Sequence, residues 1–228
     1  MPKILKIGHR GAKGYVLENT ISSILKAIEL GVDGIEIDVH KCKSGELVVF
    51  HDFTIDRLTK FTGEISNFSL TQLQDIRLRN GFKIPTLIDV LEVVNMSCFI
   101  NIELKGKNTA KETVDIIEKY VENGKANYKE FLVSSFQHRE LETVFKLNPK
   151  IHLAVLSKAN MEEATQFAAK IKAKAIHPNI ALVTRANVIH AQDLGYLVNV
   201  WTVNKKEEIE RMKQYKVDGI ISDFPDRL

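Results

Sequence analysis

The sequence predicts an α/β protein, and within that class a TIM (β/α)8 barrel, in which eight parallel strands alternate with helices. Short apolar runs alternate with longer segments of helical period along all 228 residues, and no linker interrupts this order. Eight runs separated by seven helical segments match the count of a closed barrel. An open doubly wound sheet is the alternative. Its usual phosphate loop is missing, because Gly8, Gly11 and Gly14 fit neither glycine-rich spacing.

The predicted elements follow one another in regular order. We expect strands at residues 4–8, 34–38, 98–104, 131–134, 151–155, 174–177, 197–201 and 218–221. We expect helices near residues 20–30, 86–95, 108–122, 137–147, 160–170, 184–193 and 205–214. Each helix would then connect two strands of one parallel sheet.

One stretch departs from this order. No barrel strand is predicted from His51 to Pro85, and a structureless connection of that length is improbable inside a compact domain. Ser69 followed by Gln72 has the form of a capping box and predicts a short helix. Gly45 predicts a hairpin just before the stretch. We therefore expect a single domain over residues 1–228, with an insertion at about 52–84 that covers one rim of the barrel.

Composition excludes several classes of protein. The chain has 32 Lys and Arg against 29 Asp and Glu, and no run of five like charges, so binding to nucleic acid is not expected. The sequence has neither an apolar run long enough for a membrane span nor the apolar core of a signal peptide, so no stable membrane insertion is expected. Cys42 and Cys98 form no CxxC motif, which favours free thiols in a cytoplasmic protein.

Charged residues alternate with apolar ones in the second predicted strand. Ile35, Ile37 and Val39 share one face, and helices should cover that face. Glu36 and Asp38 should then point into the barrel near the carboxyl end of the strand. Residues two apart on a strand lie roughly 6.6 Å apart, so both carboxylates can approach one cation.

The third predicted strand repeats the pattern and turns Asn101, Glu103 and Lys105 inward. Three carboxylates in one interior repel each other unless a positive charge joins them. A divalent metal would supply that charge, and oxygen ligands favour Mg²⁺ or Ca²⁺ over zinc. The alternative is a salt-bridge network with Arg10 and Lys105 that holds no metal.

Two histidines stand at comparable positions, directly after apolar runs. They are His9 and His51. Either one alone is more often a hydrogen-bonded structural residue. As a pair beside carboxylates, one neutral imidazole can accept a proton while the other, protonated, donates one. Such a pair suits hydrolysis of a phosphate ester, with the metal, Arg10 and Lys105 carrying the phosphate charge.

Seven motifs in order resemble the glycerophosphodiester phosphodiesterases of the bacterial, cytoplasmic type. They are His9-Arg10-Gly11, Glu18-Asn19-Thr20, Glu36-x-Asp38-Val39, His51-Asp52 with Arg57 and Thr59, Asn101-x-Glu103-x-Lys105, Trp201-Thr202-Val203-Asn204, and Asp218-Gly219-Ile220-Ile221-Ser222-Asp223-x-Pro225. The resemblance covers essentially the whole chain. It implies a metal-dependent TIM barrel, with a small insertion after the second strand, that cleaves glycerophosphodiesters into sn-glycerol 3-phosphate and an alcohol.

The resemblance also implies roles for individual residues. It makes Glu36, Asp38 and Glu103 the metal ligands, His9 and His51 the acid and base, Arg10 and Lys105 the phosphate contacts, and Trp201 a wall of the substrate pocket. The implied partner is a small-molecule substrate such as glycerophosphocholine or glycerophosphoethanolamine, which places the enzyme in lipid and glycerol metabolism. A homodimer is left open. Without the resemblance, Trp201 reads as a core aromatic and Asn19-Thr20 as a helix N-cap, so Glu18 stays outside the expected site.

The chain departs from the family pattern at three places: Leu17 stands for a usual Pro, Cys42-Lys43-Ser44 for Thr-x-Asp, and Leu58 for a second Thr. None of these replaces an expected ligand or proton carrier. Two alternatives remain at this point. One is a related barrel phosphodiesterase that acts on phospholipids or lysophospholipids in the manner of a phospholipase D, and the other is a non-catalytic barrel that binds a phosphorylated ligand.

Overall fold

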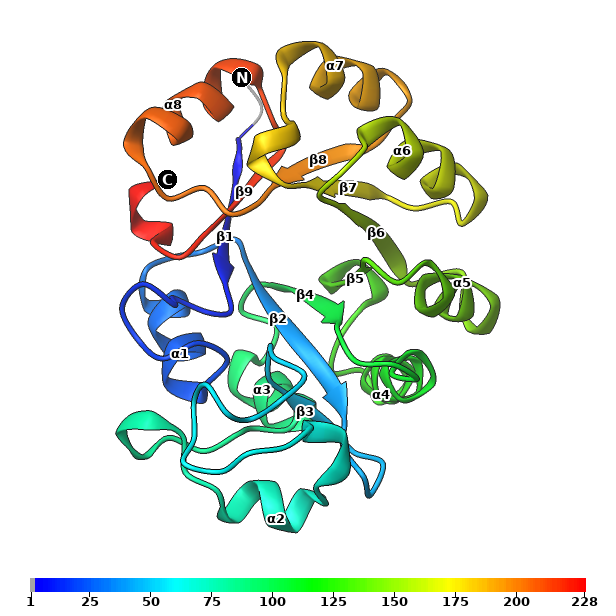
Figure 1. Cartoon of the computed structure of the whole chain (residues 1–228). Helices are drawn as coiled ribbons and strands as arrows, with labels where there is room; N and C mark the ends of the chain where they lie inside the picture. The colour runs from blue at the N-terminus through cyan, green and yellow to red at the C-terminus, as the bar shows by residue number, and fades with distance from the viewer. Residues whose placement is uncertain (1–2) are drawn as a thin grey trace.

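The computed structural model describes residues 3–228, and its centre is a closed barrel of eight parallel strands (Figure 1). The barrel strands are β1 (Leu5–His9), β2 (Gly34–Lys41), β4 (Phe99–Leu104), β5 (Phe131–Ser135), β6 (His152–Ser157), β7 (Ala175–Pro178), β8 (Leu197–Val200) and β9 (Gly219–Ser222). Strand β1 pairs with both β2 and β9, which closes the ring. The predicted TIM barrel is confirmed, although β2 continues past residue 38 to Lys41.

Helices connect the strands and surround the barrel (Figure 1). They are α1 (Ile21–Glu29), α3 (Leu87–Val94), α4 (Ala110–Glu122), α5 (His138–Leu147), α6 (Met161–Lys170), α7 (Arg185–Asp193) and α8 (Lys206–Tyr215). Thr20 is the N-cap of α1, where its hydroxyl accepts a hydrogen bond from the Ser23 amide. Three short 3-10 helices, η3 (Tyr128–Glu130), η4 (Ile180–Leu182) and η5 (Pro225–Arg227), complete the loops. No helix within residues 3–228 has the length and apolar character needed to cross a membrane.

The main hydrophobic core lies between the sheet and the helices. Ile35, Ile37 and Val39 of β2 are fully buried there, together with Ile24 and Ala27 of α1. Side chains alternate along a strand, so the intervening residues of β2 point into the barrel. The apolar face of each strand thus stabilises the barrel wall, and the inward face is left for polar and charged side chains.

The expected hairpin and insertion follow β2. The chain turns at Gly45, whose φ of +107° favours glycine, into β3 (Leu47–Val49), which runs antiparallel to β2. The segment that follows contains η1 (Ile65–Asn67), α2 (Leu70–Asp75) and η2 (Arg79–Gly81). Both hydrogen bonds of the predicted capping box form between Ser69 and Gln72.

The insertion has a hydrophobic cluster of its own. Its buried members are Cys42, Val48, Phe50, Ile55, Leu58, Ile65, Leu73, Ile76, Leu78 and Ile84. Leu58, one of the departures from the family pattern, is therefore a core residue of the insertion. This separate cluster packs the insertion beside the end of β2, at the rim where the carboxyl ends of the parallel strands meet (Figure 1).

Candidate active site

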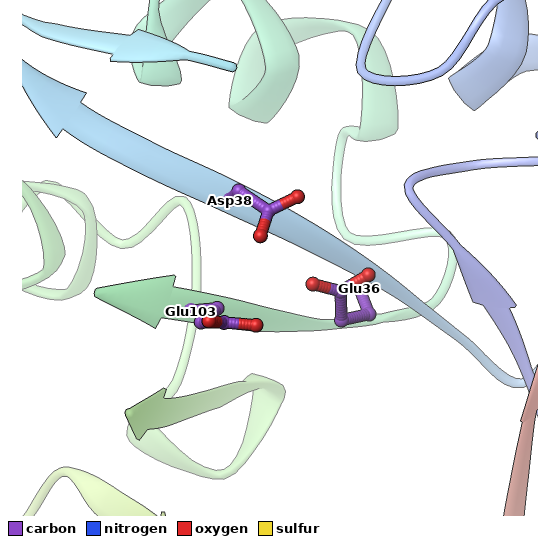
Figure 2. Close-up of side chains that lie close together, drawn as sticks. All are labelled: Glu36, Asp38 and Glu103. Atoms are coloured by element: carbon purple, nitrogen blue, oxygen red, sulfur yellow. The ribbon is translucent and has the colours of Figure 1, made fainter. Parts of the chain in front are cut away.

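Three buried carboxylates meet inside the barrel. Glu36 and Asp38 project from β2 and Glu103 from the neighbouring strand β4 (Figure 2). The register of the two strands places Asp38 opposite Glu103. One oxygen of each carboxylate lies within 4.8 Å of the others, and none of the three residues is more than 8% exposed. The structure therefore brings together all three residues that the alternation turns inward.

The electrostatics of this cluster favour an added positive charge. Burial, followed by the negative charges of Asp38 and Glu103, raises the pKa of Glu36 well above its usual value. Burial and the charge of Asp38 likewise raise the pKa of Glu103 to about 7. The Oδ1 atom of Asp38 is buried without a hydrogen-bond partner among residues 3–228. Three buried carboxylates that repel each other and offer hard oxygen donors fit a divalent cation.

Two cations already border the cluster. The backbone amide of Arg10 donates a 2.9 Å hydrogen bond to Glu36, and its Nε lies 3.3 Å from Oδ2 of Asp38. The Nζ atom of Lys105 lies 3.0 Å from Glu103 and 3.8 Å from Oδ1 of Asp38. The predicted salt-bridge contacts therefore form. Two cations do not neutralise three ionised carboxylates, however, so these contacts and a bound metal are compatible.

Both expected histidines have one ring nitrogen held by a carboxylate. The Nδ1 atom of His9, the last residue of β1, lies 2.6 Å from Oδ1 of Asp223. The Nδ1 atom of His51 lies 2.6 Å from Oδ1 of Asp52. Burial lowers the pKa of both imidazoles. A neutral imidazole that donates its Nδ1–H to a carboxylate presents Nε2 as its acceptor, which is the arrangement a general base needs.

A cavity of about 290 Å³ collects these groups at the rim. Its lining residues are His9, Arg10, Glu36, His51, Asn101, Glu103, Lys105, Phe136, Leu156, Lys158, Trp201 and Ile221. Every expected site residue lines it except Asp38, which contacts both Arg10 and Lys105. Trp201 lines the cavity and is half-buried, with its indole N–H donated to the carbonyl of His177, so it is not a core aromatic.

Comparison with known proteins shows the family of this chain. The family model described as the glycerophosphoryl diester phosphodiesterase family matches residues 9–227. The chain belongs to this family. A glycerophosphodiester phosphodiesterase of Caldanaerobacter subterraneus subsp. tengcongensis is 36% identical over 99% of this chain and 96% of its own length. One from Bacillus altitudinis is 38% identical over 96% of this chain and 94% of its own length. The expected family and its hydrolysis of phosphoric diesters are confirmed.

Solved structures of glycerophosphodiester phosphodiesterases share the fold. A phosphodiesterase from Oleispira antarctica, solved with the product sn-glycerol-3-phosphate, is 25% identical with a TM-score of 0.90, and the match covers 100% of this chain and 95% of that one. The family member from Thermotoga maritima is 29% identical with a TM-score of 0.84, over 99% of this chain and 97% of the other. The barrel fold is therefore shared with these two enzymes.

Sequence reasoning missed the residues that hold His9 in this phosphodiesterase. Asp223 follows β9, and the side-chain oxygen of Asn204 accepts a hydrogen bond from the Asp223 backbone amide at 2.9 Å. The Asn204 amide group donates a second one to Oδ2 of Asp223 at 2.9 Å. Both residues stand in motifs that carry the family resemblance, and that was the available signal.

A second missed group joins the insertion to the site. Arg57 donates hydrogen bonds to both Asp52 and Glu18, and Glu18 also accepts one from Arg10 at 2.8 Å. Burial is the largest influence and opposes ionisation of Glu18 and Asp52, but the hydrogen bonds and charges of Arg57, together with those of Arg10 at Glu18 and His51 at Asp52, outweigh it and lower the pKa of each to about 2. The excluded Glu18 therefore belongs to the polar network around the site.

Two asparagines complete the interior. Asn19 donates a 2.9 Å hydrogen bond to Oδ2 of Asp38, so it does more than precede the N-cap Thr20. Asn101 lines the cavity and is 1% exposed, and its side-chain atoms have no partner within residues 3–228. Buried amides are normally hydrogen-bonded, so Asn101 is available to a ligand in the cavity. The alternation of β4 did predict its inward direction.

Proposed function

We propose that this phosphodiesterase hydrolyses glycerophosphodiesters, among them glycerophosphocholine and glycerophosphoethanolamine, to sn-glycerol 3-phosphate and an alcohol. One observation carries the proposal: a single cavity is lined by two buried carboxylates, two cations and two carboxylate-bound histidines, and Asp38 completes the carboxylate cluster beside it. The names of the two relatives and the product held by the Oleispira antarctica enzyme support the same substrate class.

Glu36, Asp38 and Glu103 are proposed to hold one Mg²⁺ or Ca²⁺ ion. Their burial, their mutual repulsion and their hard oxygen atoms support this assignment. When bound, such an ion supplies positive charge that polarises phosphoryl and hydroxyl oxygens. The three carboxylates would hold this charge beside Arg10 and Lys105.

Arg10 and Lys105 are proposed to bind the phosphate. Both line the cavity, and both side chains end in several N–H donors. Their N–H groups can donate charge-assisted hydrogen bonds to the non-bridging oxygens. As negative charge builds on those oxygens in the transition state, these donors stabilise it without having to reorient.

His9 and His51 are proposed to carry the protons. Each has its Nδ1 atom on a carboxylate, so Nε2 is the nitrogen that exchanges a proton with the substrate. One imidazole accepts a proton from the attacking oxygen, of water or of the glycerol hydroxyl, as that oxygen bonds to phosphorus, and the other donates a proton to the alcohol oxygen as its bond to phosphorus breaks. Attack by the hydroxyl would give a cyclic phosphate, which water then opens to sn-glycerol 3-phosphate. Each transfer contributes about 100- to 10,000-fold to the rate.

The whole chain is proposed to work as a single domain in the cytoplasm. The hydrophobic cluster of the insertion and the contacts of Arg57 with Glu18 tie the insertion to the barrel. Cys42 and Cys98 are free thiols, which suits a reducing compartment.

Release of glycerol 3-phosphate from glycerophosphocholine and glycerophosphoethanolamine tests the proposal. Activity should disappear with EDTA and return when Mg²⁺ or Ca²⁺ is added in excess. Full activity in EDTA would refute metal dependence. Hydrolysis of lysophospholipids alone, or of no diester in the presence of metal, would instead support the alternative lipid substrates or a binding barrel.

A further inference from the structure

One wall of the cavity takes no part in metal binding, phosphate binding or proton transfer. It is built by Phe136, which follows β5, by Leu156 and Lys158 at the end of β6, and by Trp201, which follows β8. In the strand order of the barrel, β6 and β8 each lie three strands from β2, which carries Glu36, and β5 lies two strands from it. A phosphodiester held at the carboxylates therefore has one of its two substituents available to this wall.

The wall combines aromatic surface with cations. The rings of Phe136 and Trp201 pack edge to face with centroids 5.6 Å apart. The ammonium of Lys158 lies 5.6 Å from the centroid of Phe136, and that of Lys105 lies 5.8 Å from it. Aromatic faces attract cations, so Phe136 holds these two ammonium groups at the edge of the cavity.

The two lysines differ in how their charge is compensated. Lys105 forms ion pairs with Glu103 and Asp38. Lys158 is exposed, and within residues 3–228 it forms no ion pair with a carboxylate at 4.0 Å or less, although Glu163 lines the adjoining small cavity. Lys158 therefore leaves an uncompensated positive charge on the wall.

We propose that this wall binds the departing alcohol and that Lys158 is a specificity-determining residue for it. The inference rests on the proposed hydrolysis of glycerophosphodiesters. An ammonium group donates hydrogen bonds to hydroxyls and attracts anionic groups. It repels a quaternary ammonium, and it already lies near the Phe136 ring, an aromatic surface that would otherwise attract a cationic head group. The enzyme should therefore prefer head groups that are hydroxyl-rich or anionic over cationic ones.

The glycerol phosphate moiety is common to all these substrates, so contacts with it can be distinguished from contacts with the head group by comparing substrates. A side chain that contacts the common part changes the turnover of every substrate by the same factor. A side chain that contacts the head group changes the ratio between substrates. Glycerophosphoglycerol and glycerophosphocholine form a suitable pair, because they differ only in the head group.

The experiment compares kcat/KM for these two substrates in the metal-saturated enzyme. The wild type should prefer glycerophosphoglycerol. Lys158→Met should reduce the ratio of kcat/KM for glycerophosphoglycerol to that for glycerophosphocholine by about 3- to 10-fold. This is the effect expected of one partly solvated charge about 6 Å from a cationic head group. Lys158→Glu should reduce it further, and salt should weaken the wild-type preference. Lys150→Met is the matched control, because Lys150 lies 5.8 Å from the ring of Tyr128, away from the cavity.

Three results would overturn the inference. The first is an equal change in kcat/KM for both substrates in Lys158→Met, which would place Lys158 at the glycerol phosphate. The second is an unchanged ratio in both Lys158 variants. The third is a wild type that hydrolyses neither diester with metal present, and only this result overturns the proposed function as well.

Discussion

His9 and Asp223 are 214 positions apart in the chain, yet Nδ1 of His9 lies 2.6 Å from Oδ1 of Asp223. They meet because β1 pairs with β9 where the barrel closes. Asn204 fixes the Asp223 carboxylate through both of its side-chain polar atoms. We infer that Asp223 is a positioning residue, which holds His9 in the tautomer that presents Nε2 to the substrate.

Asp223→Asn should lower kcat about 10- to 100-fold, the usual effect of removing an orienting partner. The amide that replaces the carboxylate donates a hydrogen bond to Nδ1 and so favours the wrong tautomer. Steady-state kinetics would show the loss in kcat with KM nearly constant. Asp226→Asn is the control, because Asp226 is exposed and its side chain is hydrogen-bonded to Tyr15, away from His9. A kcat equal to that of the wild type in Asp223→Asn would refute the positioning role of Asp223.

His51→Ala and His9→Ala should each lower turnover by at least about 100-fold while the fold persists, because each removes a proposed proton carrier. Circular dichroism checks the fold, and release of glycerol 3-phosphate checks the activity. His190→Ala on α7 is the control, since His190 lies outside the cavity. Activity close to that of wild type in either His9→Ala or His51→Ala would contradict the acid and base pair.

Glu36→Gln should weaken metal binding, because it removes the charge of one of the three proposed ligands. Isothermal titration with Mg²⁺ or Ca²⁺ measures the change directly. The metal-free variant should also unfold at a higher temperature than the metal-free wild type, because a neutral amide relieves the repulsion inside the cluster. Glu29→Gln, on the surface of α1, is the control. Unchanged affinity in Glu36→Gln would refute its role as a ligand.

Arg57→Met should loosen the insertion, because Arg57 is the residue that bonds both Asp52 and Glu18. We expect faster limited proteolysis within residues 52–84 and a lower kcat, since Asp52 then holds His51 less firmly. Arg79→Met is the control from the same insertion, where Arg79 is exposed. Equal proteolysis rates in the wild type and both variants would show that the hydrophobic cluster alone holds the insertion.

His177 should make stability depend on pH. Burial lowers its pKa from 6.5 to about 3, so between those values the unfolded chain binds the proton and the folded protein does not. The stabilisation is complete above pH 6.5 and is lost as the pH falls towards 3, by about 2 kcal/mol between pH 7 and 5. Urea unfolding at pH 5, 6 and 7 measures this slope. The free energy of unfolding should fall less steeply between pH 7 and 5 in His177→Gln than in the wild type, and equal slopes would contradict the prediction.

Local patterns in the sequence were sufficient for the strands, the helices and part of the site. The alternation in Gly34 to Val39 separates the faces of β2, so the inward direction of Glu36 and Asp38 follows from residues that are neighbours in the chain. The capping box at Ser69 is equally local, and it forms as predicted. The family motifs then named the histidines and the phosphate contacts.

The partners of those residues depend on how the barrel closes. Asp223 reaches His9 only because the first and last strands pair, and Arg57 reaches Glu18 only because the insertion folds back over the rim. The sequence by itself therefore determined which side chains face the interior, since a strand repeats every two residues whatever surrounds it. Only the tertiary structure decided which of them touch, and thus which carboxylate orients each histidine, because contacts between distant segments depend on the packing of the whole chain.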